Sequence, residues 1–420
     1  MSRFRYTLAL RLLLPFALLH LLWRARRQPE YLRHWNERFG FSRPAKSGPL
    51  IWIHAVSVGE TRAAQPLIAA LRSRFPDHRI LLTQTTPTGR QTGIELFGET
   101  VERIYLPYDY PASVARFLDR WQPRFGLIME TELWPNLIAA CRERGIPLML
   151  ANGRLSARSA RRYQRFPALT GEALGGLSGV AAQTESDAAR LAALGAAEVA
   201  VLGNLKFDIT PPPEKLALGE EFRRRIGARP VFLWASTREG EEALLLDAWR
   251  RAPRRDALLL LVPRHPQRFD EVAGLCAAAG LRLQRRSANE DVAAETDVLL
   301  GDSLGEMFGY YAACDVALIG GSLLPFGSQN LIEACAVGRP ALLGPSVFNF
   351  AEAAENALAD GAALAVADAA AAVSAGLELL ADGERRAAMG RAGLAFTARH
   401  RGATARTLAW LEALLSRAGR

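Results

Sequence analysis

Short apolar runs alternate with amphipathic stretches along most of the chain. The first part contains LIWIHAV, RILLTQTT, ERIYLPY, FGLIMET, IPLMLANG, GVAAQT and VAVLGN, and a second series contains PVFLWAST, ALLLLVP, LRLQRRS, DVLLGDS, DVALIGGS and ALLGPS. The stretches between most of these runs have helical spacing. Near-continuous apolar strands that alternate with helices indicate parallel sheets covered on both faces.

The two series are separated by DITPPPEKLALGEEFRRRIGARP, where three consecutive prolines interrupt the pattern. This composition is typical of a linker, and 420 residues are long for one domain. The sequence therefore predicts an α/β protein of two Rossmann-like, doubly wound domains that face each other across a cleft. We place them at 31–210 and 229–420, the second including C-terminal helices, with the linker at 211–228.

Residues 1–30 differ in kind, because an uncharged stretch lies between Arg11 and Arg24. A spanning helix needs about 20 apolar residues, so this segment is short for a span. A secretory signal has a similar apolar core, but no small-residue cleavage site follows here. We interpret the segment as a membrane anchor, either a short span or an interfacial helix. An apolar helix packed on the protein itself is the alternative.

The distribution of arginines predicts how this anchor is oriented in the membrane. The arginines after the apolar stretch outnumber those before it, which predicts that the bulk of the protein is cytoplasmic; they are Arg24, Arg26, Arg27 and Arg33, against Arg3 and Arg5. The formal net charge of +9 suits nucleic acid, an anionic membrane or an acidic substrate. Nucleic acid is the least favoured of the three, because RGG tracts, zinc-finger spacing and aromatic-basic interleaving are all absent.

The sequence motifs of several common nucleotide-binding and catalytic sites are absent. The chain contains no GxGxxG, GxxxxGK, HExxH or Asp-x-Asp. The four cysteines lie far apart in apolar contexts, which indicates buried thiols rather than disulfides or a metal site; they are Cys141, Cys276, Cys314 and Cys335.

Candidate chemistry in the first domain follows the strand ends. LIWIHAVSVGE delivers Glu60 after a buried strand, either as part of a plain strand-to-helix turn or as a catalytic base at the sheet edge. LIMETELWPNL places Glu130 and Glu132 at a helix start, where one of them could merely complement the helix dipole. His54 has no nearby partner in sequence, and a core histidine is the favoured interpretation.

Two further loops of this domain are polar. LANGRLSARSARRY places Asn152, Gly153, Arg154 and Ser156 after a strand. GNLKFD keeps Lys206 in a chain where only three of 52 basic residues are lysines. A lysine is a compact point charge, whereas arginine is a planar fork. Function is therefore favoured at Lys206, although Lys46 and Lys215 lie in apparent loops where nothing demands lysine.

The second domain carries three candidate segments. In IGGSLLPFGSQNLIEACAVGRP, glycines precede a helix start at which Asn330 and Glu333 have capping-box spacing. Such a stretch could hold a phosphate on backbone N–H groups and ribose hydroxyls on Glu333, or be an ordinary cap. Pro263 and Arg264 end another strand, where a guanidinium suits an anion, and a solvated arginine is the alternative on this arginine-rich chain. Gly305, Glu306 and Met307 form a third turn.

Taken together, these motifs closely resemble the 3-deoxy-D-manno-octulosonic acid (Kdo) transferases of lipid A assembly. The matching segments are HAVSVGE, METELWPNL, NGRLSARS, GNLKFD, PRHPQRF, LGEM and the stretch from GGSLLPFGSQNLIEA to GPSVFNFAE. The resemblance implies a GT-B glycosyltransferase bound to the inner membrane, with its catalytic domains on the cytoplasmic side. It implies CMP-Kdo as donor, the lipid A precursor (lipid IVA) as acceptor, anionic membrane lipids as partners, and neither cofactor nor metal.

The resemblance also implies roles. Glu60 becomes the proton acceptor that activates the acceptor hydroxyl for inverting transfer, and Glu130 and Lys206 become transition-state stabilisers. The donor-binding residues are Pro263, Arg264, Gly305, Glu306, Met307, Asn330, Leu331, Ile332 and Glu333. One departure is Gln329, where the family often has His. Two alternatives stay open: a GT-B enzyme that uses another nucleotide sugar, and a catalytically silent membrane protein that binds a glycolipid or nucleotide.

Overall fold

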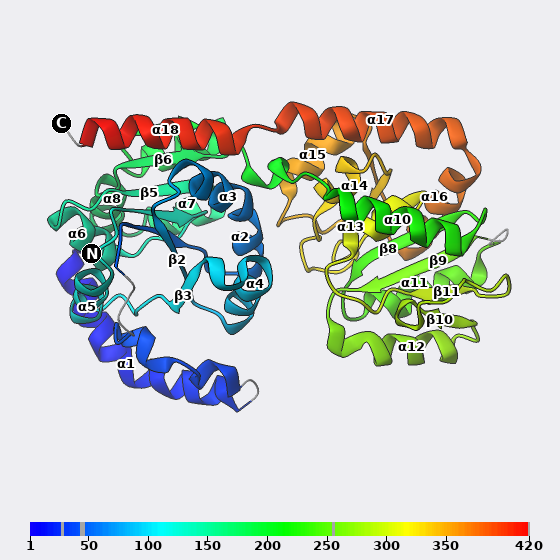
Figure 1. Cartoon of the computed structure of the whole chain (residues 1–420), viewed down its shortest axis with the longest axis horizontal. Helices are drawn as coiled ribbons and strands as arrows, with labels where there is room; N and C mark the ends of the chain where they lie inside the picture. The colour runs from blue at the N-terminus through cyan, green and yellow to red at the C-terminus, as the bar shows by residue number, and fades with distance from the viewer. Residues whose placement is uncertain (27–28, 43–46, 254–256, 419–420) are drawn as a thin grey trace. The chain divides into compact units, whose positions relative to one another are not determined.

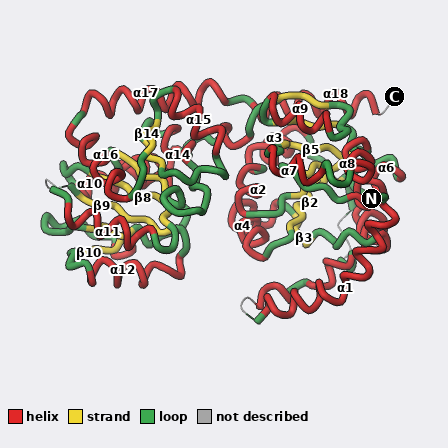
Figure 2. The backbone as a smooth tube through the Cα atoms, turned by 180° about the vertical axis from the view of Figure 1, so that it is seen from behind, coloured by secondary structure: helices red, strands yellow, loops and turns green. Residues whose placement is uncertain are grey.

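The computed structural model describes residues 1–26, 29–42, 47–253 and 257–418, so Arg27 and Lys46 lie outside the described residues. The chain forms two compact units (Figures 1 and 2). Unit 1 consists of Met1–Asp208 together with Arg401–Arg420, and unit 2 of Ile209–His400. Each unit contains a seven-stranded sheet in which all strand pairs are parallel. The predicted fold class, two doubly wound α/β domains, is confirmed.

The sheet of unit 1 has the order β3-β2-β1-β4-β5-β6-β7. Its strands are β1 Leu50–His54, β2 Arg79–Gln84, β3 Glu102–Tyr105, β4 Phe125–Met129, β5 Leu148–Gly153, β6 Gly179–Ala182 and β7 Val199–Val201. The chain first adds β2 and β3 on one side of β1 and then returns to add β4 on the other. The carboxyl ends of β1 and β4 therefore flank the topological switch point, where ligands of such sheets bind.

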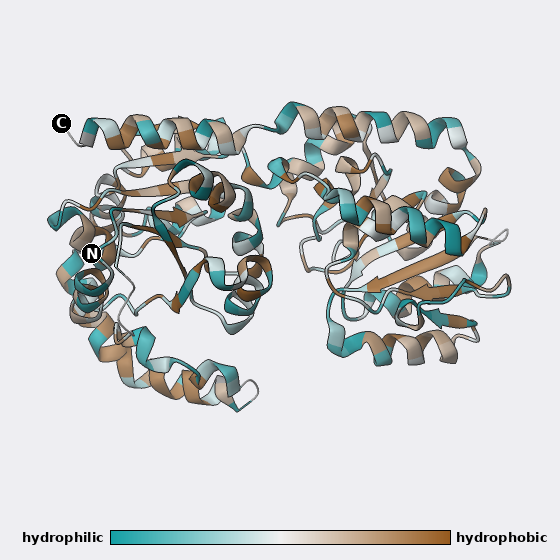
Figure 3. Ribbon diagram, in the orientation of Figure 1, coloured by the Kyte–Doolittle hydropathy of each residue, from teal (hydrophilic) through white to brown (hydrophobic). Residues whose placement is uncertain are grey.

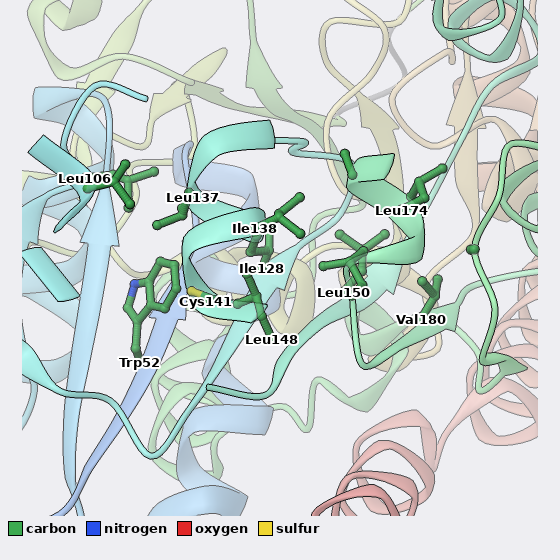
Figure 4. Packing of buried hydrophobic residues seen from close by; sticks show 14 of the residues in the cluster. Trp52, Leu106, Ile128, Leu137, Ile138, Cys141, Leu148, Leu150, Leu174 and Val180 are labelled. Atoms are coloured by element: carbon green, nitrogen blue, oxygen red, sulfur yellow. The ribbon is translucent and has the colours of Figure 1, made fainter. Parts of the chain in front are cut away.

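Helices cover both faces of this sheet. They are α2 Val58–Ala63, α3 Gln65–Arg74, α4 Pro87–Phe97, α5 Pro111–Trp121, α6 Pro135–Glu143, α7 Ala157–Tyr163, α8 Pro167–Gly175, α9 Glu185–Ala193 and α18 Ala403–Ala418. Alternate residues of β1 point to opposite faces: Trp52 packs with α5 and, as Figure 4 shows, with α6, whereas Ile51 and Ile53 pack with α3 and α18. Burial on both faces explains why the strands are apolar throughout rather than alternating.

Unit 2 repeats the plan with the order β10-β11-β9-β8-β12-β13-β14. Its strands are β8 Val231–Thr237, β9 Leu258–Pro263, β10 Leu283–Arg285, β11 Val298–Leu300, β12 Val316–Ile319, β13 Ala341–Leu343 and β14 Ala363–Ala365. Its helices are α10 Pro213–Ile226, α11 Glu241–Arg251, α12 Phe269–Ala278, α13 Met307–Ala313, α14 Leu331–Ala336, α15 Ala351–Ala359, α16 Ala369–Ala381 and α17 Gly383–His400. A core around Phe232, Trp234 and Trp249 joins β8 to α11, α12 and α16. The switch point here lies between β8 and β12.

The structure divides the chain differently from the sequence-based boundaries. The proposed linker 211–228 is mostly helix α10, which packs on α13 within unit 2. Proline is favoured in the first turn of a helix, so Pro213 begins this helix instead of breaking it. The last helix, α18, belongs to unit 1 and not to the C-terminal domain, because Ala403 and Leu411 are buried in the unit 1 core.

The predicted anchor is helix α1, Arg3–Ala25, and it too belongs to unit 1. It is the one described helix that is long and apolar enough to cross a membrane, which by itself is weak evidence for a span. Its outer face is strongly apolar and exposed (Figure 3): Phe4 is 77% exposed and Leu12 and Phe16 are each 67% exposed. The first turns of its other face contact the rest of unit 1, where Arg3 pairs with Glu143. At the far end, Leu21 and Ala25 pack with Tyr31 of the segment that follows the helix.

Candidate functional site

Glu60 lies in the first turn of α2, directly after β1 at the switch point of unit 1. Ser57 is the N-cap of this helix, and its hydroxyl accepts a hydrogen bond from the Glu60 N–H at 3.3 Å. The carboxylate folds back over the same turn: Oε1 accepts from Ser57 Oγ at 2.9 Å and Oε2 accepts from the Val56 N–H at 2.7 Å. Ser57 and Glu60 therefore form a reciprocal capping arrangement that fixes the carboxylate at the sheet edge.

The pKa of Glu60 is raised to about 7, first by burial and then by the nearby negative charge of Glu130, against the opposing hydrogen bonds from Val56 and Ser57. Burial and the charge of Glu130 also raise the pKa of Glu132. A buried carboxyl whose pKa lies near neutrality can take up and release a proton under physiological conditions. Glu60 thus has the electrostatics of a general acid or base.

Glu130 and Lys206 form an ion pair beside this group. Glu130 follows β4 with a left-handed φ of 58°, and its Oε1 accepts a hydrogen bond from Lys206 Nζ at 3.0 Å. Lys206 belongs to a short 3-10 turn, Leu205–Asp208, after β7. Asn152, at the end of β5, holds this turn, because its Oδ1 accepts from the Leu205 N–H at 3.0 Å. The structure thus brings together Glu60, Glu130 and Lys206, which are far apart in sequence.

His54 is fully buried, as expected for a core histidine. Its Nδ1 lies 3.0 Å from the carbonyl oxygen of Thr83, and burial lowers its pKa to about 4. The ring is therefore neutral near pH 7. Among the described residues, no group of three or more His, Cys, Asp or Glu side chains is arranged to hold a metal ion. All four cysteines are buried free thiols.

In unit 2 the predicted donor residues lie at or just beyond the ends of β9, β11 and β12, in three segments. Pro263 ends β9, and Arg264 follows it with Nε donating to Gln329 Oε1 at 3.1 Å. Gln329 is in the glycine-rich loop after β12, so this hydrogen bond joins two of the predicted segments. At the third segment, Met307 Sδ lies 3.7 Å from the hydroxyl of Ser236, near the end of β8.

Asn330 caps α14, with Oδ1 accepting from the Ile332 N–H at 3.0 Å, and its Nδ2 donates to Glu333 Oε1 at 3.2 Å. The capping spacing read from the sequence is therefore real, although the helix has only six residues. Leu331 and Ile332 are fully buried, so only their backbone can face a ligand.

The remaining predicted pair occupies the turn before α13. Gly305 has φ of 74°, a conformation that favours glycine. The Glu306 carboxylate is turned toward Arg286, at 3.1 Å, and hydrogen-bonds to Ser303. In this structure its carboxylate serves the local ion pair.

Comparison with known proteins decides the family. A family profile described as 3-deoxy-D-manno-octulosonic-acid transferase (kdotransferase) matches residues 33–209. A 3-deoxy-D-manno-octulosonic acid transferase of Bordetella pertussis is 49% identical over 98% of this chain and 99% of that protein. One of Haemophilus influenzae is 38% identical over 99% of this chain and 100% of that protein. The chain belongs to the Kdo transferase family. It is a glycosyltransferase enzyme that transfers Kdo in lipopolysaccharide biosynthesis.

Solved structures agree with this family at the level of the fold. A glycosyltransferase of Rickettsia africae superimposes with a TM-score of 0.59 over 88% of this Kdo transferase and 98% of that chain, at 15% identity. Anabaena HepE, solved with UDP and glucose, gives 0.58 over 88% of this chain and 99% of its own, at 14% identity. At such low identity the likeness shows the GT-B fold alone.

Two residues of this Kdo transferase escaped the sequence analysis. Ser57 holds the Glu60 carboxylate, and the S-x-x-E spacing of a capping box would have revealed it. Arg238 follows β8 directly, just as Arg264 follows β9, so the same strand-end signal was available for both.

Proposed function

We propose that this enzyme transfers Kdo from CMP-Kdo to the lipid A precursor, with Glu60 as the general base. The observation that carries the proposal is the buried Glu60 carboxyl, with a pKa of about 7, beside the Glu130–Lys206 ion pair at the switch point of unit 1. A sugar hydroxyl is a poor nucleophile near neutral pH, so a positioned base is required. The resemblance of HAVSVGE, METELWPNL and GNLKFD to family motifs supports the same three residues.

In the proposed reaction, Glu60 removes the proton from the acceptor hydroxyl as the hydroxyl oxygen attacks the anomeric carbon of Kdo. The bond between that carbon and the phosphate oxygen of CMP breaks, CMP leaves with the bonding electrons, and the configuration inverts. Glu60 keeps a lone pair for this proton on each carboxylate oxygen after its two hydrogen bonds. Lys206 stabilises negative charge that develops in the transition state, and Glu130 holds the ammonium in place.

Unit 2 is the proposed donor unit. Arg264 offers a guanidinium to an anion of CMP-Kdo, and Asn330 and Glu333 offer polar atoms near the glycine-rich loop to the nucleoside. Gly305, Glu306 and Met307 complete the proposed surface, with Pro263 shaping the loop that carries Arg264. The reaction as proposed needs neither a metal ion nor a cofactor.

Helix α1 is the proposed membrane attachment, at the cytoplasmic side of the inner membrane. Its contacts favour a helix lying in the interface over a span: the Thr7 hydroxyl donates to Asn136 Oδ1 at 3.0 Å, and the Tyr110 hydroxyl donates to the Leu10 carbonyl at 2.9 Å. A spanning helix would lose these contacts and the Arg3–Glu143 pair. An in-plane helix keeps them and gives its exposed apolar face to the lipid. Anionic lipids would then meet the exposed Arg26 and Arg33 of the flanking segment.

Product analysis by mass spectrometry tests the function. Purified enzyme receives lipid IVA and CMP-Kdo, and Glu60→Gln is assayed beside it. Wild type should add the mass of one or more Kdo units, and the variant should be slower by about 10²- to 10⁴-fold. Transfer from a different nucleotide sugar and not from CMP-Kdo would contradict the donor. Transfer at the wild-type rate by Glu60→Gln would contradict the base and leave the transferase standing.

A further inference from the structure

Arg238 occupies the ligand-binding position of the unit 2 sheet but belongs to none of the segments assigned above. It directly follows β8, the strand that lies between β9 and β12. Arg264 follows β9, and Gly320 and Gly321 follow β12. Since doubly wound sheets bind ligands beyond the strand ends at the switch point, Arg238 stands at the centre of the expected site.

A buried carboxylate fixes the backbone of this residue. Glu241 is fully buried and accepts three backbone hydrogen bonds: from the Arg238 N–H at 2.8 Å, from Gly321 at 2.6 Å and from Leu323 at 3.0 Å. One carboxylate therefore ties the loop after β8 to the glycine-rich loop after β12. Arg238 is held in register with that loop, as a ligand-binding group must be.

The side chain of Arg238 is held as well. Its guanidinium carbon lies 4.4 Å from the centroid of the Phe326 ring, in a cation–π contact. A Cβ atom at Gly321, where φ is 68°, would lie 3.3 Å from Arg238 Cγ and 3.2 Å from Gln329 Nε2. The side chains of Arg238 and Gln329 thus pack over the same glycine, and any larger residue there would push them away.

Gln329 connects this cluster to Arg264. Its Oε1 accepts from Arg264 Nε at 3.1 Å, and the Arg264 N–H donates at 3.0 Å to the carbonyl of Thr237, the residue before Arg238. The two arginines are therefore joined both through the backbone and through the Gln329 amide. A neutral amide orients the Arg264 guanidinium without neutralising it.

Arg238 and Arg268 differ in how their positive charges are paired. Arg268 pairs with Glu242 at 2.7 Å and with Glu271 at 2.9 Å. Within the described part of the chain, Arg238 has no ion-pair partner, and its buried Nε makes no hydrogen bond. A guanidinium that is partly removed from water without a partner is costly, so an anionic ligand would supply what the protein does not.

His265 responds to this positive charge. Burial lowers its pKa, and the charges of Arg238, Arg264 and Arg268 lower it further, against the opposing charge of Glu239. The region between the ends of β8 and β9 is therefore positively charged, which disfavours a protonated His265 and favours a bound anion.

We propose that Arg238 is a second anion ligand of the donor site, which together with Arg264 binds the negatively charged groups of CMP-Kdo. The donor offers two such groups, the phosphodiester and the carboxylate of the sugar. Gln329 acts as a positioning residue that aims Arg264. This inference rests on the proposed donor.

The test measures binding to the full-length enzyme by calorimetry, with CMP and cytidine as ligands, and KM for CMP-Kdo. The variants are Arg238→Gln, which removes the charge, and Arg238→Lys, which keeps it but loses the fork. Arg250→Gln, at an exposed position of α11, is the matched control. If Arg238 binds the phosphate, Arg238→Gln weakens CMP about 10- to 100-fold and leaves cytidine unchanged. If it binds the sugar carboxylate, CMP binding is unchanged and KM for CMP-Kdo rises by a similar factor.

Two results separate this inference from the proposed function. If Arg238→Gln matches Arg250→Gln in CMP affinity and in KM, while wild type binds CMP and transfers Kdo, the anion role is wrong and the function stands. If wild type neither binds CMP nor uses CMP-Kdo, the donor itself is wrong. Gln329→Glu is a second probe: it keeps an acceptor for Arg264 but adds a negative charge, so CMP should weaken and cytidine should not. Unchanged CMP binding in that variant would contradict the two-arginine site.

Discussion

At the residue scale, Glu60 completes a strand-to-helix turn and also has the electrostatics that the proposed base requires. It completes the turn from strand to helix by capping α2 with Ser57, and its carboxylate is held where its pKa is about 7. The hydrogen bonds from Val56 and Ser57 favour the ionised form, whereas burial and Glu130 oppose it. The balance keeps the proton available near neutral pH.

This balance predicts the pH dependence of the rate. Only the ionised form of Glu60 can accept a proton, so kcat/KM should rise with pH and level off above about 7. The measurement is a rate profile between pH 5 and 9 with donor and acceptor at low concentration. A profile that is flat from pH 5 upward would contradict a raised pKa at the base.

The same carboxyl predicts a pH-dependent difference in stability. In the unfolded chain Glu60 loses its proton near pH 4.5, but in the folded chain only near pH 7. Wild type should therefore lose stability relative to Glu60→Gln as pH rises across that window, because the folded state binds the proton more tightly. Urea unfolding at pH 4.5 and pH 8 measures it, with exposed Glu95→Gln as the control. If the free energy of unfolding changed equally with pH in wild type and in Glu60→Gln, burial of Glu60 would not be the cause.

Asn152 illustrates how a residue acts through another. It occupies the left-handed region with φ of 56°, and its side chain holds the turn that carries Lys206. Asn152→Ala should lower kcat because Lys206 is no longer fixed. In a Lys206→Ala background the same change should have little further effect on kcat, since residues acting as a unit are not additive. Additive losses in the double variant would make Asn152 merely structural.

At the element scale, α1 shows what apolar patterning leaves open. Its composition suits a span, an interfacial helix or a core helix equally, and only the contacts made by residues such as Arg3, Thr7 and Leu10 favour one of them. Those partners lie 100 or more positions away in sequence, so the local pattern cannot indicate them.

An in-plane α1 predicts that both ends of the helix lie on the side of the catalytic units. Ser2→Cys should react with a membrane-impermeant maleimide in inverted inner-membrane vesicles but not in intact spheroplasts. The native cysteines are buried and leave the background low. Ser416→Cys, exposed near the end of α18, marks the side of unit 1. Labelling of the two sites from opposite sides would establish a span instead.

At the scale of the whole molecule, the sequence is a good guide to strands and a poor guide to boundaries. Apolar runs such as LIWIHAV and ALLLLVP become β1 and β9 because burial on both faces demands that composition. The strand ends also give Glu60, Glu130 and Arg264 correctly as sheet-edge residues. The hydrophobic periodicity of a helix does not indicate which sheet the helix packs on. The helix α18 carries an ordinary amphipathic pattern, and only tertiary packing assigns it to unit 1.

The packing of α18 on unit 1 predicts which unit a mutation in this helix destabilises. Leu411 is fully buried in the unit 1 core, and Asp208, the last residue of the turn that carries Lys206, accepts from the Gly402 N–H at 2.6 Å just before α18. Leu411→Ala should destabilise unit 1 by about 2–5 kcal/mol and speed amide hydrogen exchange in β4 and β5 more than in β8 and β9. Leu379→Ala, equally buried in α16 of unit 2, should do the reverse. If Leu411→Ala instead loosened unit 2 first, the C-terminal helix would belong to unit 2, as its place in the sequence suggests.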